Sequence, residues 1–191
     1  MKKLLCTISL VVIAAASCFA QDNTPDNMVV PPQDTAISFS EAVNVNGVSK
    51  EELFTRARDW LNLNMASLRI QDKTDGELGA RGTVLGQATV RFLGSHTIPA
   101  TFAFLMTVWV KDGRYMYTVT NVFNTSLNGS PGNGTFGELF TSKVCSVSIP
   151  GYSQSKLNEA YQTAKDSFAG IEAGMADSFK AAMTEPSTPN F

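Results

Sequence analysis

The strongest constraint on the fold is an apolar stripe near the C-terminus that no charged residue interrupts. Its members recur at steps of three and four, which is helical spacing: Leu157, Tyr161, Ala164, Phe168, Ile171, Met175 and Phe179. A continuous helix over residues 153–183 would be about 46 Å long, and its stripe needs a surface of similar length. An extended strand over residues 98–110 would span about 43 Å. A break near Gly170 or Gly174 is the alternative, with the far end free or paired with another subunit.

A hairpin centred on Asp112-Gly113 can provide that surface. This dipeptide is typical of a two-residue turn that pairs Lys111 with Arg114, and counting outward fixes the remaining pairs. One side is a core face, with the pairs Val110–Tyr115, Val108–Tyr117, Met106–Val119, Phe104–Asn121 and Phe102–Phe123. The other is mixed in polarity, with the pairs Trp109–Met116, Thr107–Thr118, Leu105–Thr120 and Ala103–Val122.

The remaining segments predict further strands and one more helix. Ser49 and Glu52 have the spacing of a capping box, and the apolar spacing after them predicts an amphipathic helix over residues 50–63. Strands are predicted over residues 37–45, 67–71 and 79–93, with Gly82 and Gly86 as candidate bulges. The segment 124–150 begins with a long glycine-rich loop, and its second half is ambiguous between strand and helix. The sequence therefore predicts an α+β domain of antiparallel strands and a long C-terminal helix.

The N-terminus has the three-part pattern of a secretory signal peptide. Lys2 and Lys3 precede an apolar run of 13 residues, well short of the ~20 that cross a bilayer. Cleavage after Ala20 is expected, and lipidation of Cys18 is the alternative. We predict an exported protein of the periplasm or cell envelope, with no transmembrane segment in its mature form. Its parts are a signal peptide (1–20), a disordered leader (21–36), a single α+β domain (37–183) and a C-terminal tail (184–191).

Charge and cysteine content argue against several classes of function. Loss of Lys2 and Lys3 would take the formal charge from −2 to −4. An acidic surface does not attract phosphate backbones, so no nucleic-acid partner is expected. The mature soluble form would keep Cys145 alone, which excludes an internal disulfide and a thiol-rich metal site. No metal or cofactor is expected, because the acidic residues of one turn lack the spacing of a calcium loop: Asp72, Asp75 and Glu77.

The candidates for catalysis are one histidine and one cysteine. His96 lies in a short polar turn, and Cys145 lies within an apolar alternation. No serine has an elbow motif, and a thiol mechanism would need His96 beside Cys145. We expect His96 to be a solvated turn residue and Cys145 a small core residue, so the protein is predicted not to be an enzyme. A hydrolase or thiol enzyme that uses both residues is the alternative.

The mixed face of the hairpin holds the candidate binding residues, which are Leu105, Trp109, Met116 and Val122. Either the segment 124–150 covers them, or they form an exposed apolar patch that indicates a partner or ligand surface. We hypothesise a non-catalytic module that binds an unknown envelope protein or a small apolar ligand. A cleft lined by Phe102, Phe104 and Tyr117 would favour the ligand. A structural protein that forms oligomers through the C-terminal helix is a further alternative, and the oligomeric state is left open.

Short motifs between Ile37 and Phe123 form a further pattern. They are Gly47-Val48-Ser49-Lys50-Glu51-Glu52-Leu53-Phe54, Arg56-Ala57, Trp60, Ile70-Gln71-Asp72, Gly76, Gly82 and Lys111-Asp112-Gly113-Arg114-Tyr115. With these motifs the stretch resembles a bacterial family of unknown function with a TBP-like fold. The resemblance implies a curved antiparallel sheet with helices on one face, in the order β-α-β-β-β-β-α, and an exported protein of Gram-negative envelopes. It implies no activity and no DNA binding, because fold does not carry function.

Overall fold

The computed structural model describes residues 35–91, 94–128 and 134–185. The predicted signal peptide, the leader up to residue 34 and the tail from residue 186 lie outside this part. Six strands and two helices are present in it: β1 (Phe39–Asn44), α1 (Lys50–Asn64), β2 (Ser67–Asp72), β3 (Glu77–Arg91), β4 (Ser95–Lys111), β5 (Arg114–Leu127), β6 (Gly137–Glu138) and α2 (Gln154–Thr184). The bounds of α1 and α2 agree with the predicted ones to within one residue.

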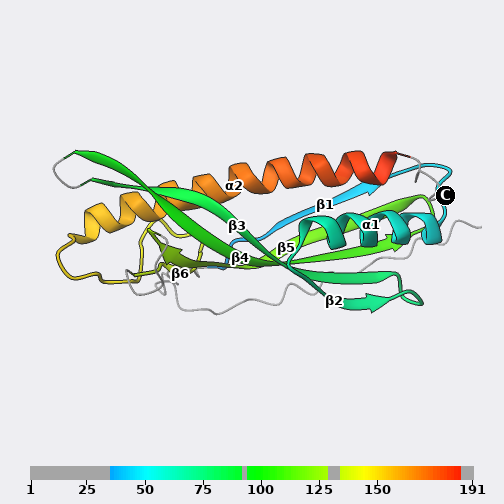
Figure 1. Cartoon of the computed structure of the whole chain (residues 1–191), viewed down its shortest axis with the longest axis horizontal. Helices are drawn as coiled ribbons and strands as arrows, with labels where there is room; N and C mark the ends of the chain where they lie inside the picture. The colour runs from blue at the N-terminus through cyan, green and yellow to red at the C-terminus, as the bar shows by residue number, and fades with distance from the viewer. Residues whose placement is uncertain (1–34, 92–93, 129–133, 186–191) are drawn as a thin grey trace, which may run out of the picture. The chain divides into compact units, whose positions relative to one another are not determined.

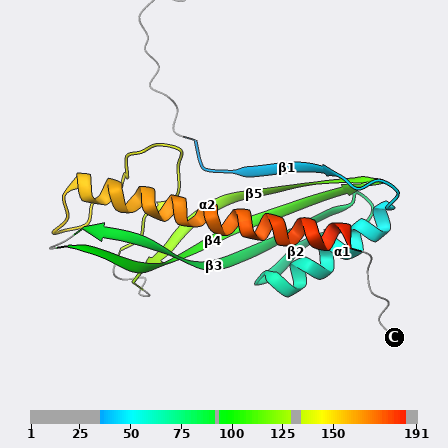
Figure 2. The ribbon, with the colours of Figure 1, turned by 90° about the horizontal axis from the view of Figure 1, so that it is seen from above.

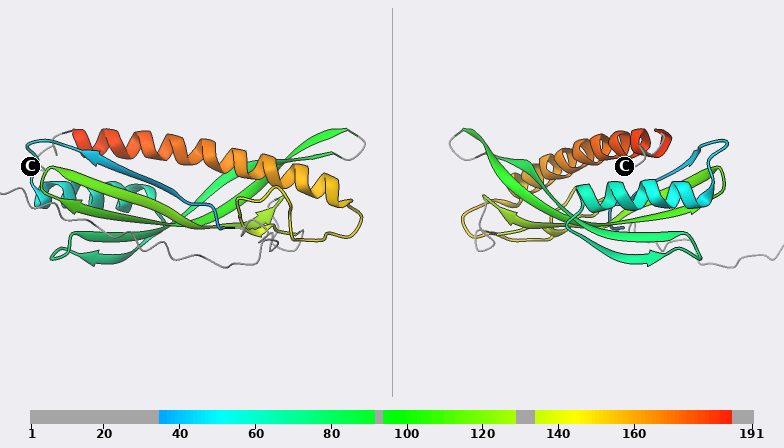
Figure 3. Two further views of the ribbon diagram at one scale, coloured as in Figure 1. Left: turned by 180° about the vertical axis from the view of Figure 1, so that it is seen from behind. Right: turned by 45° about the vertical axis from the view of Figure 1, so that its right-hand side comes forward.

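The strands form one antiparallel sheet in the order β2-β3-β4-β5-β1, and the short β6 pairs with β5 beyond the end of β1. Both helices lie on one side of this sheet, and α2 runs along it (Figures 1, 2 and 3). The predicted α+β class is therefore confirmed, with a helix after the first strand and a long C-terminal helix on one face. Pairing at the N-terminal end begins at Thr35, where the Thr141 amide donates to the Thr35 carbonyl.

The hairpin around Asp112-Gly113 has the predicted register over its first seven pairs, from Lys111–Arg114 to Leu105–Thr120. Beyond Thr120, β5 contains an extra residue, Asn121, with φ of 52°. The predicted pairs Phe104–Asn121, Ala103–Val122 and Phe102–Phe123 are therefore wrong: Phe123 lies opposite Ala103, and Asn124 lies opposite Phe102. This β-bulge turns Val122 to the helix-covered face, where it is fully buried.

Gly82 and Gly86 do not form the predicted bulges, because β3 pairs with β4 without a shift from Glu77–Trp109 to Arg91–Ser95. Both glycines make room for other groups instead. A Cβ atom on Gly82 would lie 2.2 Å from the ring of Phe104, and one on Gly86 would lie 2.7 Å from Ser167 Oγ of α2. The missing side chains thus allow an aromatic ring and a helix to approach the sheet closely.

The core lies between the sheet and the two helices, and α2 spans it without a break at Gly170 or Gly174. Phe168 packs against the rings of Phe39, Phe102 and Phe104, at centroid distances of 5.9, 5.5 and 5.6 Å. About three turns further along α2, Phe179 packs against the rings of Trp60, Tyr115 and Tyr117. Phe102, Phe104 and Tyr117 are at most 3% exposed. They fill the core between sheet and helix, so they do not form the cleft that would have favoured a ligand there.

α2 also covers an unpaired edge of the sheet. β2 pairs only with the first part of β3, which leaves the outer backbone of residues 83–91 without a strand partner among the described residues. Two hydroxyls of α2 accept hydrogen bonds from this edge: Ser167 Oγ from the Gln87 amide at 3.0 Å, and Thr163 Oγ1 from the Thr89 amide at 2.8 Å. Because free strand edges promote aggregation, this cover has a protective role beyond the burial of the stripe.

Candidate functional site

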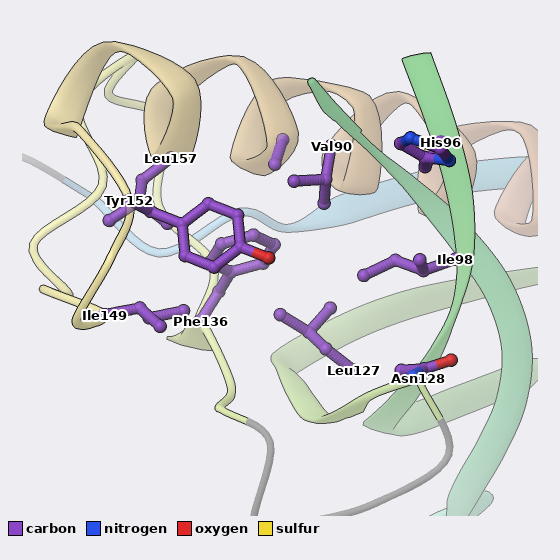
Figure 4. A pocket seen from close by; sticks show the side chains of 10 residues that line it. Val90, His96, Ile98, Leu127, Asn128, Phe136, Ile149, Tyr152 and Leu157 are labelled. Atoms are coloured by element: carbon purple, nitrogen blue, oxygen red, sulfur yellow. The ribbon is translucent and has the colours of Figure 1, made fainter. Parts of the chain in front are cut away.

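A cleft of ≈ 390 Å³, here called the end cleft, lies between the first turns of α2, the end of the β3–β4 hairpin and the segment 134–153 (Figure 4). Its lining consists of Val90, His96, Ile98, Leu127, Asn128, Phe136, Ile149, Tyr152, Leu157 and Ala160. Seven of these residues are aliphatic side chains or Phe136. The volume lies within the range of small-ligand pockets, about 300–1,000 Å³, and the apolar lining is also typical of them.

A buried amide positions one wall of the end cleft. Asn124 is 1% exposed, and its Nδ2 donates hydrogen bonds to the carbonyls of Thr101 (3.1 Å) and Ser126 (3.0 Å). Its Oδ1 accepts a hydrogen bond from the Phe136 amide at 2.9 Å. The ring of Phe136 then packs edge-on against Tyr161 of α2, with 5.5 Å between the centroids. The wall thus depends on the bulge that turns Asn124 inward.

The chain after Phe136 is fastened to α2, although past β6 it has no regular strand or helix. The hydrogen bonds run from the Phe140 amide to Tyr161 Oη (2.6 Å), from Lys165 Nζ to the carbonyls of Phe140 (3.0 Å) and Ser142 (2.6 Å), and from the Cys145 amide to Asn158 Oδ1 (2.9 Å). This segment therefore packs on α2 and brings Ile149 and Tyr152 to the end cleft.

Three polar side chains line the end cleft: His96, Asn128 and Tyr152. Figure 4 shows the ring of Tyr152 directed into the space between α2 and the hairpin. Asn128 has φ of 56°, and its backbone amide donates to the Pro99 carbonyl at 2.7 Å. A few polar groups within an apolar lining can orient a ligand that has one hydrogen-bonding end.

The two residues predicted as catalytic candidates have different surroundings. His96 is exposed and lines the end cleft, whereas Cys145 is 3% exposed and is not among the residues that line it. Burial raises the pKa of the Cys145 thiol, and a hydrogen bond with Val147 opposes this only in part. The thiol is therefore the favoured form, whereas a nucleophile would need the thiolate.

Among residues 35–91, 94–128 and 134–185, no three His, Cys, Asp or Glu residues come together in a way that could hold a metal ion. In the same part of the chain, neither helix is long and apolar enough to cross a membrane.

The predicted binding residues divide between the two faces of the sheet. Leu105, Trp109 and Met116 lie on the face opposite the helices, here called the open sheet face, whereas the bulge places Val122 in the core. Met116 and Phe123 are 41% and 40% exposed on the open sheet face. The described hydrogen bonds of the segment 134–150 lead to α2, β5 and the chain before β1. The segment 134–150 therefore does not cover Met116 and Phe123.

A groove of ≈ 480 Å³, here called the hairpin groove, lies at the turn end of this face. It is lined by Ala42, Val43, Asn44, Trp109, Lys111, Arg114, Tyr115 and Met116. Across the strands, Met116 lies opposite both Ala42 and Trp109. The groove therefore combines an apolar floor with two cationic side chains.

The part of the chain that matches a known family contains most of the sheet. Residues 39–124 match the model of a domain of unknown function, DUF4468, with TBP-like fold. Over this range the chain is similar to the DUF4468 family. A crystal structure of a DUF4468 family protein from Bacteroides ovatus is similar, with a TM-score of 0.54 and 14% sequence identity over 81% of this chain and 90% of that chain. A TBP-like protein from Parabacteroides distasonis has a TM-score of 0.46 and 14% identity over 74% and 93% of the two chains. No curated protein matches.

The two hollows relate differently to the domain match over residues 39–124. Every residue that lines the hairpin groove lies within residues 39–124, on β1, β4 and β5. The end cleft takes Val90, His96 and Ile98 from the domain and its other lining residues from the chain that follows it. At 14% identity, the similarity to the Bacteroides ovatus protein shows the fold alone.

A buried carboxyl group of α2, that of Glu172, lies near Glu41 of β1 and Tyr117 of β5. Glu172 is 8% exposed; burial, and then the nearby Glu41 carboxylate, raises the pKa of Glu172. Glu41 pairs with Lys180 at 2.7 Å and accepts a hydrogen bond from the Tyr117 hydroxyl at 3.2 Å. The hydrogen bond from Lys180 is the main cause that lowers the pKa of Glu41. Burial also raises the pKa of Tyr115 to about 12.

Glu172→Gln is expected to stabilise the domain at neutral pH. Because the folded state raises the pKa of Glu172, it favours the protonated form, and wild-type stability falls as the pH rises through that pKa. Gln is neutral throughout, so the gain in unfolding free energy over wild type should be absent near about pH 4 and grow toward about pH 7. Urea unfolding across this range measures it. Asp166→Asn, at an exposed position on α2, is the control, and an equal gain there would contradict the burial explanation.

Proposed function

We propose that this protein is an exported, non-catalytic binding module of the cell envelope, and that the end cleft binds a small apolar ligand with one hydrogen-bonding group. The observation that carries the proposal is the lining itself. An apolar hollow of ≈ 390 Å³ opens beside a filled core, and its three polar groups lie among aliphatic side chains and Phe136. The signal-peptide pattern of the first 20 residues supports the export.

Binding is favoured over catalysis because the side chains that line the end cleft do not form a nucleophile–base pair. His96 is the histidine that lines the end cleft, and the buried Cys145 is not among the lining residues. A general base acts only within hydrogen-bond reach of a nucleophile or a substrate proton. The apolar side chains, by contrast, contribute to affinity directly when a ligand covers them, at roughly 25 cal/mol per Å².

The experiment uses N-phenylnaphthylamine, a neutral apolar fluorophore, with the full chain purified from its own envelope fraction. A saturable rise in fluorescence is expected from wild type. Val90→Phe should fill the cleft and weaken the affinity about tenfold or more, which corresponds to about 1.4 kcal/mol. Leu85→Phe places the same ring on the same strand at a position that is 70% exposed, outside the cleft lining. It should bind the probe as wild type does.

Equal affinities for wild type and Val90→Phe would exclude the end cleft as the ligand site. Native mass spectrometry of the same preparation identifies a molecule that is carried through purification. Cys145→Ser separates the two classes of function, because it should leave probe binding and the biological role intact. Loss of that role in a stably folded Cys145→Ser variant would favour the thiol enzyme instead.

A further inference from the structure

The hairpin groove is a second site, which shares no lining residue with the end cleft. Its apolar floor is built by cross-strand neighbours: Met116 of β5 lies between Ala42 of β1 and Trp109 of β4. Met116 is 41% exposed and Trp109 is half-buried. The second tryptophan, Trp60, is only 6% exposed and packs under α2 against Phe179. Trp109 is therefore the tryptophan that a molecule in the groove would contact.

Two uncompensated cations flank this floor. Lys111 and Arg114 are the closing pair of the hairpin, and both are exposed. Neither side chain forms an ion pair with any residue that the structure describes. The whole chain, by contrast, has a formal charge of −2. A local cationic site on an acidic protein attracts anions specifically to that place.

Asp112 lies between these two cations in the sequence, but its carboxylate has a different hydrogen-bond partner. Asp112 Oδ1 accepts a hydrogen bond at 2.7 Å from the Lys50 amide, the first residue of α1. The helix N-terminus favours this negative charge, so the carboxylate is held at the helix and does not pair with Lys111 or Arg114. Glu77 of the neighbouring strand β3 lies opposite Trp109, and no ion pair joins Glu77 to Lys111 or Arg114.

We propose that the hairpin groove binds a small anionic amphiphile. Its apolar body lies on Trp109 and Met116, and its anionic head pairs with Lys111 and Arg114. Charge complementarity selects this class: a neutral molecule would leave both cations without a partner, and a fully hydrated anion would not use the apolar floor. An arginine fork and a lysine ammonium bind a carboxylate, sulfonate or phosphate through charge-assisted hydrogen bonds.

The test compares two probes with related rings, anilinonaphthalene sulfonate and the neutral N-phenylnaphthylamine. The sulfonate should bind, and excitation of Trp109 should sensitise its emission; Trp109→Phe should abolish that transfer although Trp60 remains. Lys111→Gln combined with Arg114→Gln should weaken sulfonate binding about tenfold or more. The same double variant should remove most of the salt dependence of binding. Its affinity for the neutral probe should not change.

Arg69→Gln combined with Lys143→Gln is the matched control, because it removes two exposed positive charges outside the groove. The proposal is overturned if this control weakens sulfonate binding as much as the groove variant does. It is also overturned if Val90→Phe, in the end cleft, abolishes sulfonate binding. Co-sedimentation with phosphatidylglycerol vesicles tests a membrane surface. Vesicle binding that needs Lys111 and Arg114, without any binding of the free sulfonate, would overturn the small amphiphile as the ligand and indicate a lipid surface instead.

Discussion

A chain that ends at Pro150, and therefore lacks α2, is expected to give an insoluble or molten product instead of a folded domain. The helix contributes nine buried residues, among them the fully buried Phe168 and Phe179. Burial of each large apolar side chain contributes about 1.5–3 kcal/mol, whereas a whole domain is stable by only about 5–15 kcal/mol. Loss of the helix thus removes an amount comparable to the total stability, and it also uncovers the amides of Gln87 and Thr89.

Near-ultraviolet circular dichroism and amide resonances measure this prediction. A chain that ends at Glu185, just after α2, is the control and should keep a dispersed spectrum. A monomeric, well-dispersed product from the chain that ends at Pro150 would show that the helix is an accessory. The alternative in which α2 forms oligomers would then become the stronger hypothesis.

The features that the sequence predicts correctly are those set by local chemistry. The turn at Asp112-Gly113 fixes which residues lie opposite one another, and seven pairs follow from it. The side chain of Ser49 accepts a hydrogen bond from the Glu52 amide at 3.3 Å, so the start of α1 is also set locally. The periodicity of α2 extends past Gly170 and Gly174, because its stripe is buried on both sides of these glycines.

The β5 bulge could not be found by counting from the turn. One residue in the left-handed region, Asn121, is enough to exchange the faces for the residues after it, up to a second register shift between Asn124 and Ser126. Asparagine tolerates that conformation better than most residues do, but the same residue also occurs in ordinary turns and strands. As a result Val122 was predicted on the wrong face, whereas Leu105, Trp109 and Met116, which lie nearer to the turn, were predicted on the correct one.

The end cleft was not predicted because it has no motif. Its lining comes from β3, β4, β5, α2 and the irregular segments before and after β6. Taken singly, residues such as Val90 and Leu127 look like ordinary core residues in the sequence. His96 was singled out for its chemistry and does lie at the cleft, but its position follows from its place opposite Val90 at the end of the hairpin.

Phe104→Ala is expected to cost about 3–5 kcal/mol of unfolding free energy, the usual range for a buried phenylalanine. Phe104 is 2% exposed and packs edge-on against Phe168, although its predicted partner Asn121 is displaced by the bulge. The extra residue lies on β5, so alternation along β4 is unbroken and still directs Phe104 into the core. Denaturant unfolding measures the loss. A loss below about 1 kcal/mol would mean that the ring does not lie in the core.

A second substitution shows whether the ring of Phe104 really covers Gly82. Gly82→Ala alone should cost about 1–3 kcal/mol through overpacking, since its Cβ would lie 2.2 Å from the Phe104 ring. In the Phe104→Ala background that ring is absent, so Gly82→Ala should be neutral or slightly stabilising, because alanine suits a strand interior better than glycine. The two changes should therefore couple by at least about 1 kcal/mol. Strict additivity in the double-mutant cycle would show that Gly82 is required for another reason, and that the close approach of ring and backbone does not determine the residue at this position.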